Sequence, residues 1–461
     1  MRLESLLVIM IVLPLVLLFP TVQARAAIIT VGPSDCSAPL VNNAISSASD
    51  GDTVLLTCTG SVTWSSLVSI PSTKGITLAV KGGTNSPKGS ANFPLTVVSS
   101  VSLGATLKVT AGPNNSLSRV TGFKFQNAGV TAGERGLLWV SGCGQGKTGL
   151  GSFRIDNNYF DTISGRAIIA IYSTCNKLYG LFDNNTMHDA FRADDLNYGP
   201  YGIQIWNDFK DANGCWGANG WTDPLTFGNV EWVFIEDNLF ENLTTPKMMR
   251  HYVSHEEGGR SVVRYNTFVS NATAPDGGAP DFIEGHGLCI CATNGCGVRA
   301  VEVYRNTMQG SAVNRYFQVR GGSWLIYDNT FSSAWNRAYA SPIMLMEYRA
   351  GSSQMYNQCL TSATCPCTSP WYPSVTDGSK YPLAQQIFGT YAWGNLYQGV
   401  NRDPAVDPAG VQPLYIQQGR DYFTSTSKPA ALSSYTPFIY PHPLRNASNP
   451  PPSPPQSLAV Q

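Results

Sequence analysis

The chain has 461 residues, of which 30 are Lys or Arg and 30 are Asp or Glu, so its formal net charge is zero. This balance excludes the strongly basic face that nucleic-acid binding needs and a polybasic patch for a membrane surface. Only 13% of the residues are charged and 44 are Gly, a composition that favours a turn-rich β protein. The length exceeds that of an ordinary single core unless repeated units extend it.

Residues 1–26 have the features of a signal peptide. Arg2 supplies a positive start, an apolar run follows from Leu6 to Phe19, and Ala24-Arg25-Ala26 matches a small-x-small cleavage site. The apolar run is short for a membrane span. We therefore expect a secreted protein, extracellular or periplasmic, that is not held in a membrane after signal removal.

The eleven Cys residues fit an oxidising compartment, in which most are expected to form disulfides. We predict a bridge between Cys36 and Cys58, which flank one short N-terminal unit. The odd total leaves at least one thiol unpaired or intermolecular. For the group Cys289, Cys291 and Cys296, a zinc site is the alternative to disulfides.

The sequence pattern of residues 27–60 predicts a cap on the N-terminal end of the fold. Apolar residues recur at helical spacing between 41 and 48, the turn Asp50-Gly51-Asp52 follows, and a strand is expected at 53–56. An amphipathic helix in this place would cover the first open edge of a β-structure.

Six strand-like segments end in Asn, one further residue, and then Phe or Met. The Phe and Met residues follow one another at steps of 27, 53, 28, 40 and 23 residues. If the step of 53 holds two turns and the step of 40 holds one turn with an insertion, the period lies in the mid-twenties. Such a period predicts a coil of stacked parallel β-strands, each repeat being a strand, a turn and another strand. The six Asn residues are Asn158, Asn185, Asn238, Asn266, Asn306 and Asn329.

The chain is expected to form one domain at 27–445. Regular coils are predicted over about 75–350, and irregular C-terminal loops over 351–445 that end in GRDYF (419–423) and YTPFIYPHPL (435–444). A Pro-rich linker or tail is predicted for 446–461.

Several of these segments together resemble a known group of proteins. The run AISSASDGDTVLL, a following GITL, the GF-x-F-x-N turn and the repeated hydrophobic-x-x-N-x-F pattern resemble secreted right-handed parallel β-helix proteins of the pectate-lyase-like superfamily. The pattern GRDYF…YPHPL resembles uncharacterised bacterial members of that group. The resemblance covers roughly residues 30–350 and implies an all-β, right-handed parallel β-helix with a helical cap and an irregular C-terminal wrap.

The resemblance also implies that the recurrent Asn residues form a buried ladder at a sharp turn, with the Phe and Met residues stacked inside. The residue chemistry agrees, because Asn tolerates left-handed backbone and forms local hydrogen bonds.

Ionisable residues are densest between 250 and 302, where three of the five His residues lie. This stretch contains the insertion predicted at 269–298, and loops on a rigid coil are the usual carriers of functional sites. His286 lies between two glycines that permit close approach of a ligand, and it titrates near neutral pH. We predict His286 and Arg299 as catalytic residues.

Two further catalytic candidates follow from a register argument. Aligning Asn266 with Asn306 puts Arg264 and Glu302 on the outer face of adjacent coils. An exposed ion pair without function is the alternative for these two residues. We predict that Arg264 and Glu302 converge with His286 and Arg299 in one groove.

Elimination on a uronate needs one group that neutralises the carboxylate and another that accepts the proton of the neighbouring carbon. Ca²⁺ or Arg can serve for the first, and Arg, Lys or His for the second. For Trp206, ordinary loop packing is the alternative to stacking on a sugar. The predicted Ca²⁺ ligands are Glu256, Asp281 and Glu284, and the predicted substrate contacts are His255, Arg320 and Trp206.

These residues favour a protein that cleaves a uronate-containing polysaccharide by β-elimination, as a monomer and without nucleic acid. A hydrolase is the enzymatic alternative, because Asp194-Asp195 and Gly285-His286-Gly287 resemble polygalacturonase motifs. The two motifs are 91 residues apart, about three coils, so we interpret the match as coincidence. The non-enzymatic alternative is an adhesin or carbohydrate-binding scaffold, since the calcium-binding Asp pattern and the Arg motif of pectate lyases are absent from the sequence.

Overall fold

The computed structural model describes residues 26–86, 88–89, 92–111, 116–128, 132–133, 136–142, 151–173, 178–191, 200–207, 225–245, 247–256, 258–273, 278–286, 298–335, 340–346, 387–408 and 416–446. The predicted signal peptide up to Arg25, the nine cysteines from Cys143 onward, the Asp194-Asp195 pair and the tail from 447 lie outside these residues. Among the described helices, none is long and apolar enough to cross a membrane.

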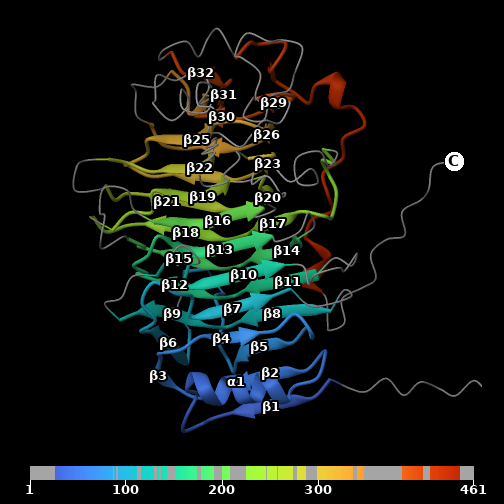
Figure 1. The fold of residues 1–461 in the computed structure, drawn as a ribbon. Coiled ribbons are helices and arrows are strands. Elements are labelled where there is room, and N and C mark those ends of the chain that lie inside the picture. The colour runs from blue at the N-terminus through green and yellow to red at the C-terminus, as the bar shows by residue number, and fades with distance from the viewer. Residues whose placement is uncertain are drawn as a thin grey trace, which may run out of the picture.

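The described strands stack into three parallel sheets, and each regular coil contributes one strand to each sheet in turn (Figure 1). The sequence predicts two strands per coil; the third, in sheet C, carries no Asn signal and was therefore missed. The chain forms the predicted parallel β-helix. Sheet A contains β1 (Ile28–Val31), β2 (Thr53–Leu56), β5 (Thr77–Val80), β8 (Leu117–Thr121), β11 (Gly151–Asp156), β14 (Leu178–Asp183), β17 (Val233–Glu236), β20 (Arg260–Arg264), β23 (Ala300–Tyr304), β26 (Ser323–Tyr327), β29 (Thr390–Trp393) and β33 (Tyr422–Ser425).

The other two sheets have the following bounds. Sheet B contains β3 (Gly60–Trp64), β6 (Leu95–Ser99), β9 (Lys124–Asn127), β12 (Tyr159–Asp161), β15 (Thr186–His188), β18 (Leu239–Asn242), β21 (Thr267–Ser270), β24 (Thr307–Gln309), β27 (Thr330–Phe331), β30 (Leu396–Tyr397) and β31 (Val400–Asn401). Sheet C contains β4 (Val68–Ile70), β7 (Leu107–Thr110), β10 (Leu138–Gly142), β13 (Ala167–Ser173), β16 (Tyr201–Asn207), β19 (His251–Glu256), β22 (Asp281–Gly285), β25 (Arg315–Val319), β28 (Ile343–Leu345) and β32 (Ala405–Val406). Two 3₁₀ turns, Ala430–Leu432 and Pro443–Arg445, lie near the C-terminus.

The N-terminal helix α1 (Ala38–Ser47) occurs where the sequence predicts one, and it lies beside β1 and β4 at the N-terminal end of the coil (Figure 1). Val41, Ala44 and Ile45 share its buried face. Cys36 and Cys58 form the predicted disulfide. That α1 protects the open edge of the coil stays a prediction.

The six Asn side chains form a buried column at the turn from sheet A to sheet B, each at most 1% exposed. Asn238 shows the pattern: its Oδ1 accepts from the backbone N–H of Asn185 at 2.9 Å, and its Nδ2 donates to Asn266 Oδ1 at 3.0 Å. Asn395 extends the column, because its Oδ1 accepts from Asn329 Nδ2 at 2.9 Å. The predicted ladder is confirmed.

The left-handed backbone expected at the ladder Asn occurs one residue earlier. φ is 55° at Asn184, 56° at Asp237 and 57° at Tyr265, each directly before a ladder Asn. The residue before therefore makes the bend, which costs energy for a residue other than Gly. The ladder Asn contributes hydrogen bonds that hold the bend.

The Phe and Met residues after each ladder Asn lie inside the coil, as predicted. Phe240 and Phe268 are fully buried, and their rings stack at a centroid distance of 4.9 Å. These residues are core and do not form a platform for a sugar.

Replacing Asn238 with Ala should lower the free energy of unfolding by roughly 2–4 kcal/mol, because buried backbone groups of two coils lose their partners. Chemical denaturation measures this change. Asn43→Ala is the matched control, since Asn43 is exposed on α1 and its replacement should change stability by less than about 0.5 kcal/mol. Equal effects of the two substitutions would contradict the role given to the ladder.

Candidate functional site

Sheet C carries three rows of outward side chains that run from coil to coil. The first row aligns Tyr201, His251, Asp281 and Arg315, and the second aligns Gln204, Ser254, Glu284 and Gln318. The third starts with Trp206 opposite Glu256 and continues just beyond the strand ends with His286 and Arg320. Parallel strands lie ~4.8 Å apart, so neighbours in a row can touch. We call the following residues the sheet C cluster: His251, Ser254, Glu256, Asp281, Glu284, His286, Arg315 and Arg320.

Glu284 is the centre of the sheet C cluster and is fully buried. Its Oε2 accepts from Ser254 Oγ at 3.1 Å and lies 3.2 Å from His251 Nε2. Its Oε1 lies 2.9 Å from His286 Nδ1 and forms an ion pair with Arg320. A buried carboxylate requires such partners. Glu284 therefore orients two imidazoles and one guanidinium on the same face.

A second ion pair lies beside Glu284. Arg315 Nε and Nη2 donate to the two carboxylate oxygens of Asp281 at 2.8 and 2.9 Å. Burial alone would raise the pKa of Asp281, but the charge and hydrogen bonds of Arg315 outweigh it and hold the pKa below its ordinary value. His251 lies between both carboxylates, with its Nδ1 3.9 Å from Asp281 and its ring stacked on Tyr201 at 5.4 Å.

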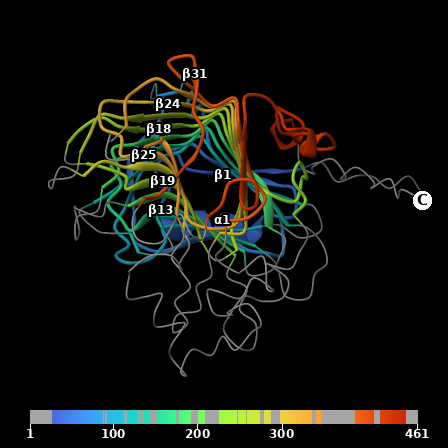
Figure 2. The same cartoon turned by 90° about the horizontal axis from the view of Figure 1, so that it is seen from above.

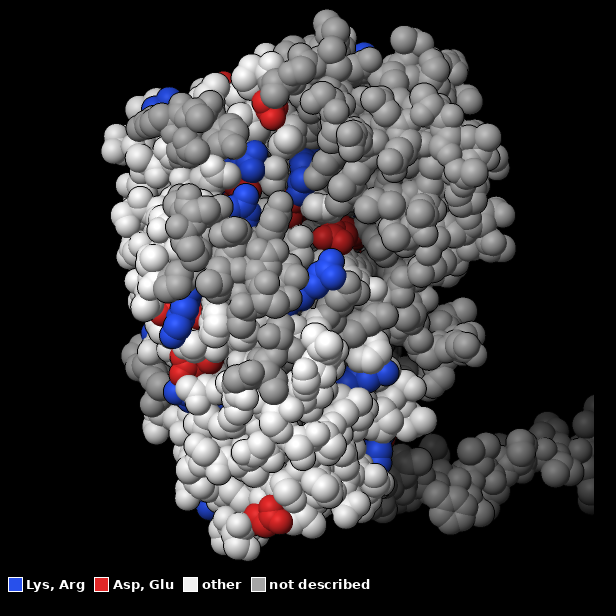
Figure 3. Space-filling model, turned by 60° about the vertical axis from the view of Figure 1, so that its left-hand side comes forward, with Lys and Arg blue, Asp and Glu red and all other residues white. Residues whose placement is uncertain are grey.

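His286 lies at the end of β22 with its side chain 13% exposed. Burial lowers the pKa of His286 below its ordinary value, while the charge of Glu256 opposes this effect. The imidazole is therefore neutral near pH 7 and can accept a proton. Arg320 Nη2 lies 2.6 Å from its Nδ1. Figure 3 shows basic and acidic side chains gathered in a hollow at the height of β19, β22 and β25.

Arg299 reaches the same end of the sheet C strands from the next coil. The N–H of Val298 donates to the backbone oxygen of His286 at 3.1 Å, and Arg299 follows directly. The Arg299 guanidinium lies 5.3 Å from the ring centre of Phe388. The backbone of Arg299 is therefore close to that of His286, and the predicted convergence of the two side chains stays a prediction.

Trp206 and Glu256 face outward on adjacent strands and are both half-buried. Glu256 Oε1 accepts from Gln204 Nε2 at 3.1 Å. Trp206 packs edge-on against Tyr172 at a ring-centroid distance of 4.6 Å. Trp206 thus lies next to Glu256 at the N-terminal side of the sheet C cluster.

The structure places His255 inside the coil, so the predicted substrate contact is not possible there. His255 is fully buried; its Nδ1 lies 2.9 Å from the backbone oxygen of Glu284, and its Nε2 lies 2.5 Å from Ser261 Oγ. The reason is strand alternation: residues 251–256 form strand β19, in which neighbouring side chains point to opposite faces. Similarly, Asp281–Gly285 is strand β22 within the predicted insertion.

The structure also separates Arg264 and Glu302 from His286. Their register is as predicted, with Arg264 opposite Tyr304 on adjacent strands of sheet A. Both side chains are nevertheless fully buried. The cause is residues 428–446, the C-terminal strap, which lies against the outside of sheet A (Figure 2).

The C-terminal strap binds both predicted residues directly. Arg264 donates to the backbone oxygens of Phe438 at 2.6 Å and Ile439 at 2.9 Å. Glu302 accepts from the hydroxyl of Tyr435, and burial raises its pKa above the ordinary value. Neither side chain can reach a ligand on sheet C, so the predicted four-residue groove does not form.

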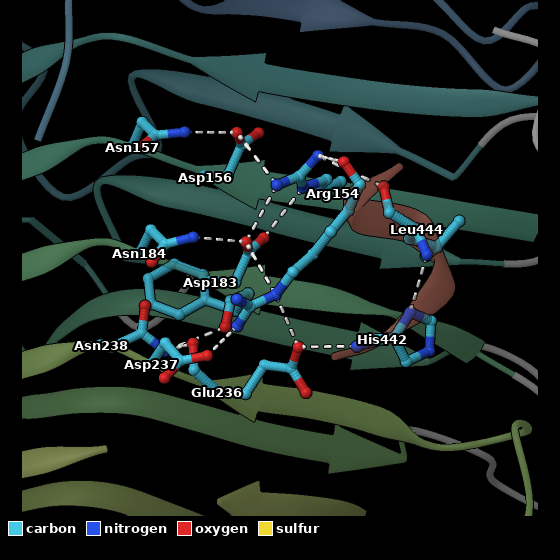
Figure 4. Close-up of polar contacts among 12 residues, drawn as sticks. Arg154, Asp156, Asn157, Asp183, Asn184, Glu236, Asp237, Asn238, His442 and Leu444 are labelled. Carbon is cyan, nitrogen blue, oxygen red and sulfur yellow. Dashed lines mark hydrogen bonds and ion pairs between the residues drawn. The ribbon is translucent and has the colours of Figure 1, made fainter. Parts of the chain in front are cut away.

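An ion-pair network continues along the same face (Figure 4). Arg154 donates to both oxygens of Asp183 at 2.9 Å and to the backbone oxygen of Arg445 at 2.9 Å. Arg445 in turn donates to Glu236 at 2.8 Å and forms an ion pair with Asp237. The C-terminal strap therefore covers the outer face of sheet A from β11 to β23.

The predicted Ca²⁺ ligands do not form a ready cation site. No group of three His, Cys, Asp or Glu side chains among the described residues is arranged to hold a metal ion. Asp281 is paired with Arg315 and Glu284 with Arg320, so their oxygens already face positive groups. We therefore assign no chemical step to Ca²⁺.

Three members of the sheet C cluster were missed as site residues: His251, Ser254 and Arg315. The register argument used the Asn ladder, which lies at another corner of the coil and does not align sheet C. Aligning YGIQIW, HYVSHE, DFIEGH and RYFQVR with each other would have revealed the rows.

No protein-family model matches the chain, and no curated protein matches it. The solved structures that are similar to this chain include the following three. An alginate lyase from Paenibacillus sp. str. FPU-7 has a TM-score of 0.39 and 14% identity over 83% of this chain and 96% of that chain. A mutant of the PL6 family alginate lyase AlyGC has a TM-score of 0.40 and 12% identity over 87% of this chain and 53% of that chain. Geobacillus virus E2 ORF18 has a TM-score of 0.34 and 11% identity over 67% of this chain and 56% of that chain. TM-scores this low carry no argument about activity, and the fold assignment rests on the strand pairing of the chain itself.

Replacing Arg264 with Met should lower the free energy of unfolding by about 3–5 kcal/mol, because Glu236 and two strap carbonyls lose a buried partner. Denaturant unfolding measures the change. Arg305→Met is the control, since the Arg305 side chain is 53% exposed and should contribute little. If Arg264→Met matched this control, the strap would not depend on the buried pair.

Buried neutral histidines should make the protein acid-sensitive. Burial lowers the pKa of His255 to about 3. The unfolded chain takes up a proton near pH 6.5 and the folded chain does not, so this contribution to stability is complete above that pH and is lost as pH falls. Between pH 7 and 5 the loss from His255 should be about 2 kcal/mol.

Unfolding at the two pH values of the parent and of His255→Gln, which cannot titrate, checks this prediction. The variant should lose less stability on acidification. His188 supplies a contrast of opposite sign, because its hydrogen bond to Glu241 raises its pKa. Its contribution is present below pH 6.5 and is lost as pH rises, so His188→Gln should lose more stability on acidification than the parent. An unchanged pH dependence in His255→Gln would contradict the assignment.

Proposed function

We propose that the protein cleaves a uronate-containing polysaccharide by β-elimination at the sheet C cluster. The observation that carries the proposal is the buried carboxylate of Glu284, which holds His251, His286 and Arg320 together on one outward face. Buried ionisable groups that orient one another in a hollow are typical of acid–base sites. A polymer substrate of this kind fits the secreted location predicted from the signal peptide.

In the proposed reaction His286 is the general base. This role requires the tautomer in which Nδ1 donates to Glu284 and Arg320 pairs with Glu284 rather than with Nδ1. Nε2 is then the nitrogen that takes the proton from the carbon next to the uronate carboxylate. The electron pair of that C–H bond forms a carbon–carbon double bond, and the bond from the next carbon to the glycosidic oxygen breaks. The leaving oxygen receives a proton from the imidazolium or from solvent. Arg299 or Arg320 would neutralise the uronate carboxylate, which makes the proton easier to remove.

A hydrolase is less well supported by the described carboxyl groups of sheet C. Hydrolysis needs one protonated carboxyl as the general acid and a second, ionised carboxylate. The pKa of Asp281 is lowered, and Glu284 accepts from basic side chains and a hydroxyl, so neither is suited to donate a proton. A scaffold that only binds glycan is the remaining alternative, and Ca²⁺ dependence stays a prediction.

The test is incubation with a panel of uronate polysaccharides, read by the far-ultraviolet absorbance of the unsaturated product. His286→Ala and Arg299→Ala should each lower turnover by ~10²-fold or more, the scale for loss of an acid–base or charge-stabilising group. Arg305→Ala, on the far side of the coil, is the control and should retain activity. The same assay with and without EDTA tests Ca²⁺.

The other outcomes separate the alternatives. New reducing ends without the absorbance would identify a hydrolase, and binding without either product would identify a scaffold. Full activity in both variants would place the site elsewhere.

A further inference from the structure

The outer face of sheet C has two chemically different halves. On the coils of β19, β22 and β25 it carries the charged groups of the sheet C cluster. On the coils of β13 and β16 the described outward residues include Tyr172, Tyr201, Gln204 and Trp206, and none of the described residues of these two strands is charged. We call Tyr172 and Trp206, with Trp139 on β10, the aromatic half.

The aromatic half is continuous with the proposed reaction site. Trp206 pairs with Glu256 on the next strand, and the position after that in the same row is His286. Two coil steps of ~4.8 Å separate Trp206 from His286, about 10 Å in all. A glycan chain lying along the coil axis would therefore contact both within a few sugar rings.

The rings of the aromatic half are held by packing within the face. The edge of Tyr172 supports Trp206 at an interplanar angle of 67° and a centroid distance of 4.6 Å. Further along, Lys108 lies 4.0 Å from the centre of the Trp139 ring. An aromatic side chain fixed in this way offers a preorganised apolar surface, which reduces the entropy lost when a ligand binds.

The two halves select different sugars. The C–H face of a neutral sugar can cover an aromatic ring and remove apolar area from water. A uronate over Tyr172 or Trp206 would find no described cation on β13 or β16 and would lie beside Glu256, so it would lose hydration without gaining a partner. The described cation of this face, Lys108 at Trp139, is on β7, three strands from β16. On the charged half the opposite holds, because the guanidinium of Arg320 lies 2.6 Å from His286 Nδ1.

We infer that the substrate is a heteropolysaccharide in which a uronate at the sheet C cluster is joined to neutral sugars that lie on the aromatic half. This inference rests on the proposed β-elimination and narrows its substrate class. Polymers made only of uronates should be poor substrates, because one of their carboxylates would meet Trp206.

The test measures how efficiently the full-length protein cleaves two sets of glycans. One set contains homopolyuronates, and the other contains polymers in which uronates alternate with neutral or N-acetylated sugars. Unsaturated product should form at least ~10-fold more efficiently, as kcat/KM, from the mixed set. Trp206→Ala should raise KM for mixed polymers by ~10-fold or more with kcat nearly unchanged, and Trp206→Phe should restore most of the affinity. Lys124→Ala, on sheet B, is the control outside this face.

Each other outcome has a definite reading. Equal or better cleavage of homopolyuronates, unaffected by Trp206→Ala, would overturn the inference and leave the elimination intact. A lower melting temperature of Trp206→Ala with KM unchanged would overturn it too, because Trp206 would then serve packing alone. Binding of mixed glycans that is lost in Trp206→Ala, without any unsaturated product, would support the neutral-sugar subsite and reject the elimination.

Discussion

The structure depends on one repeated hydrogen bond, from the buried amide of each ladder Asn to the ladder Asn of the next coil. The amide also accepts from the backbone N–H of its neighbour, as between Asn238 and Asn185. Buried backbone groups at a sharp corner would otherwise lack partners. Because the coils from β11 to β29 are tied at the same corner, they stack without slipping, and side chains at equivalent positions form rows.

The rows of outward side chains have different surroundings on sheet A and on sheet C. On sheet A, the outward row of Glu236 and Arg264 carries charges that the C-terminal strap covers, and the strap carbonyls accept from Arg264. On sheet C, the row of Ser254, Glu284 and Gln318 lies among the charged side chains of the sheet C cluster. Charge on an outward strand position thus serves to bind the chain's own terminus in one place, and we propose that it serves a ligand in the other.

Buried charge is unfavourable unless it is fully paired, so both networks constrain the fold. In the strap network the partners are backbone oxygens and side chains of the same chain, such as Arg154 with Asp183. In the sheet C cluster the partners include the imidazoles of His251 and His286, and burial lowers the pKa of both. His286 combines an ion-pairing partner, Glu284, with a lowered pKa. That combination distinguishes a site suited to proton transfer from a structural ion pair.

The sequence by itself determined the architecture, because the Asn and the following Phe or Met recur on six consecutive coils, from β11 to β26, and each has a local role. The sequence also predicted, from other local patterns, the Cys36–Cys58 disulfide and the helix α1, and the Asn alignment predicted the register of β20 with β23. It identified the charged stretch between 250 and 302, together with His286, Glu284 and Arg320 as site residues.

Only the tertiary structure decided which of these residues share a surface. His255 turns inward because residue 254 faces outward, and this alternation could not be aligned from the Asn ladder at another corner. Arg264 and Glu302 are closed off by a segment more than 130 residues later in the chain, Tyr435 to Ile439. Such contacts depend on where the C-terminal strap folds back, which no local pattern in either segment specifies.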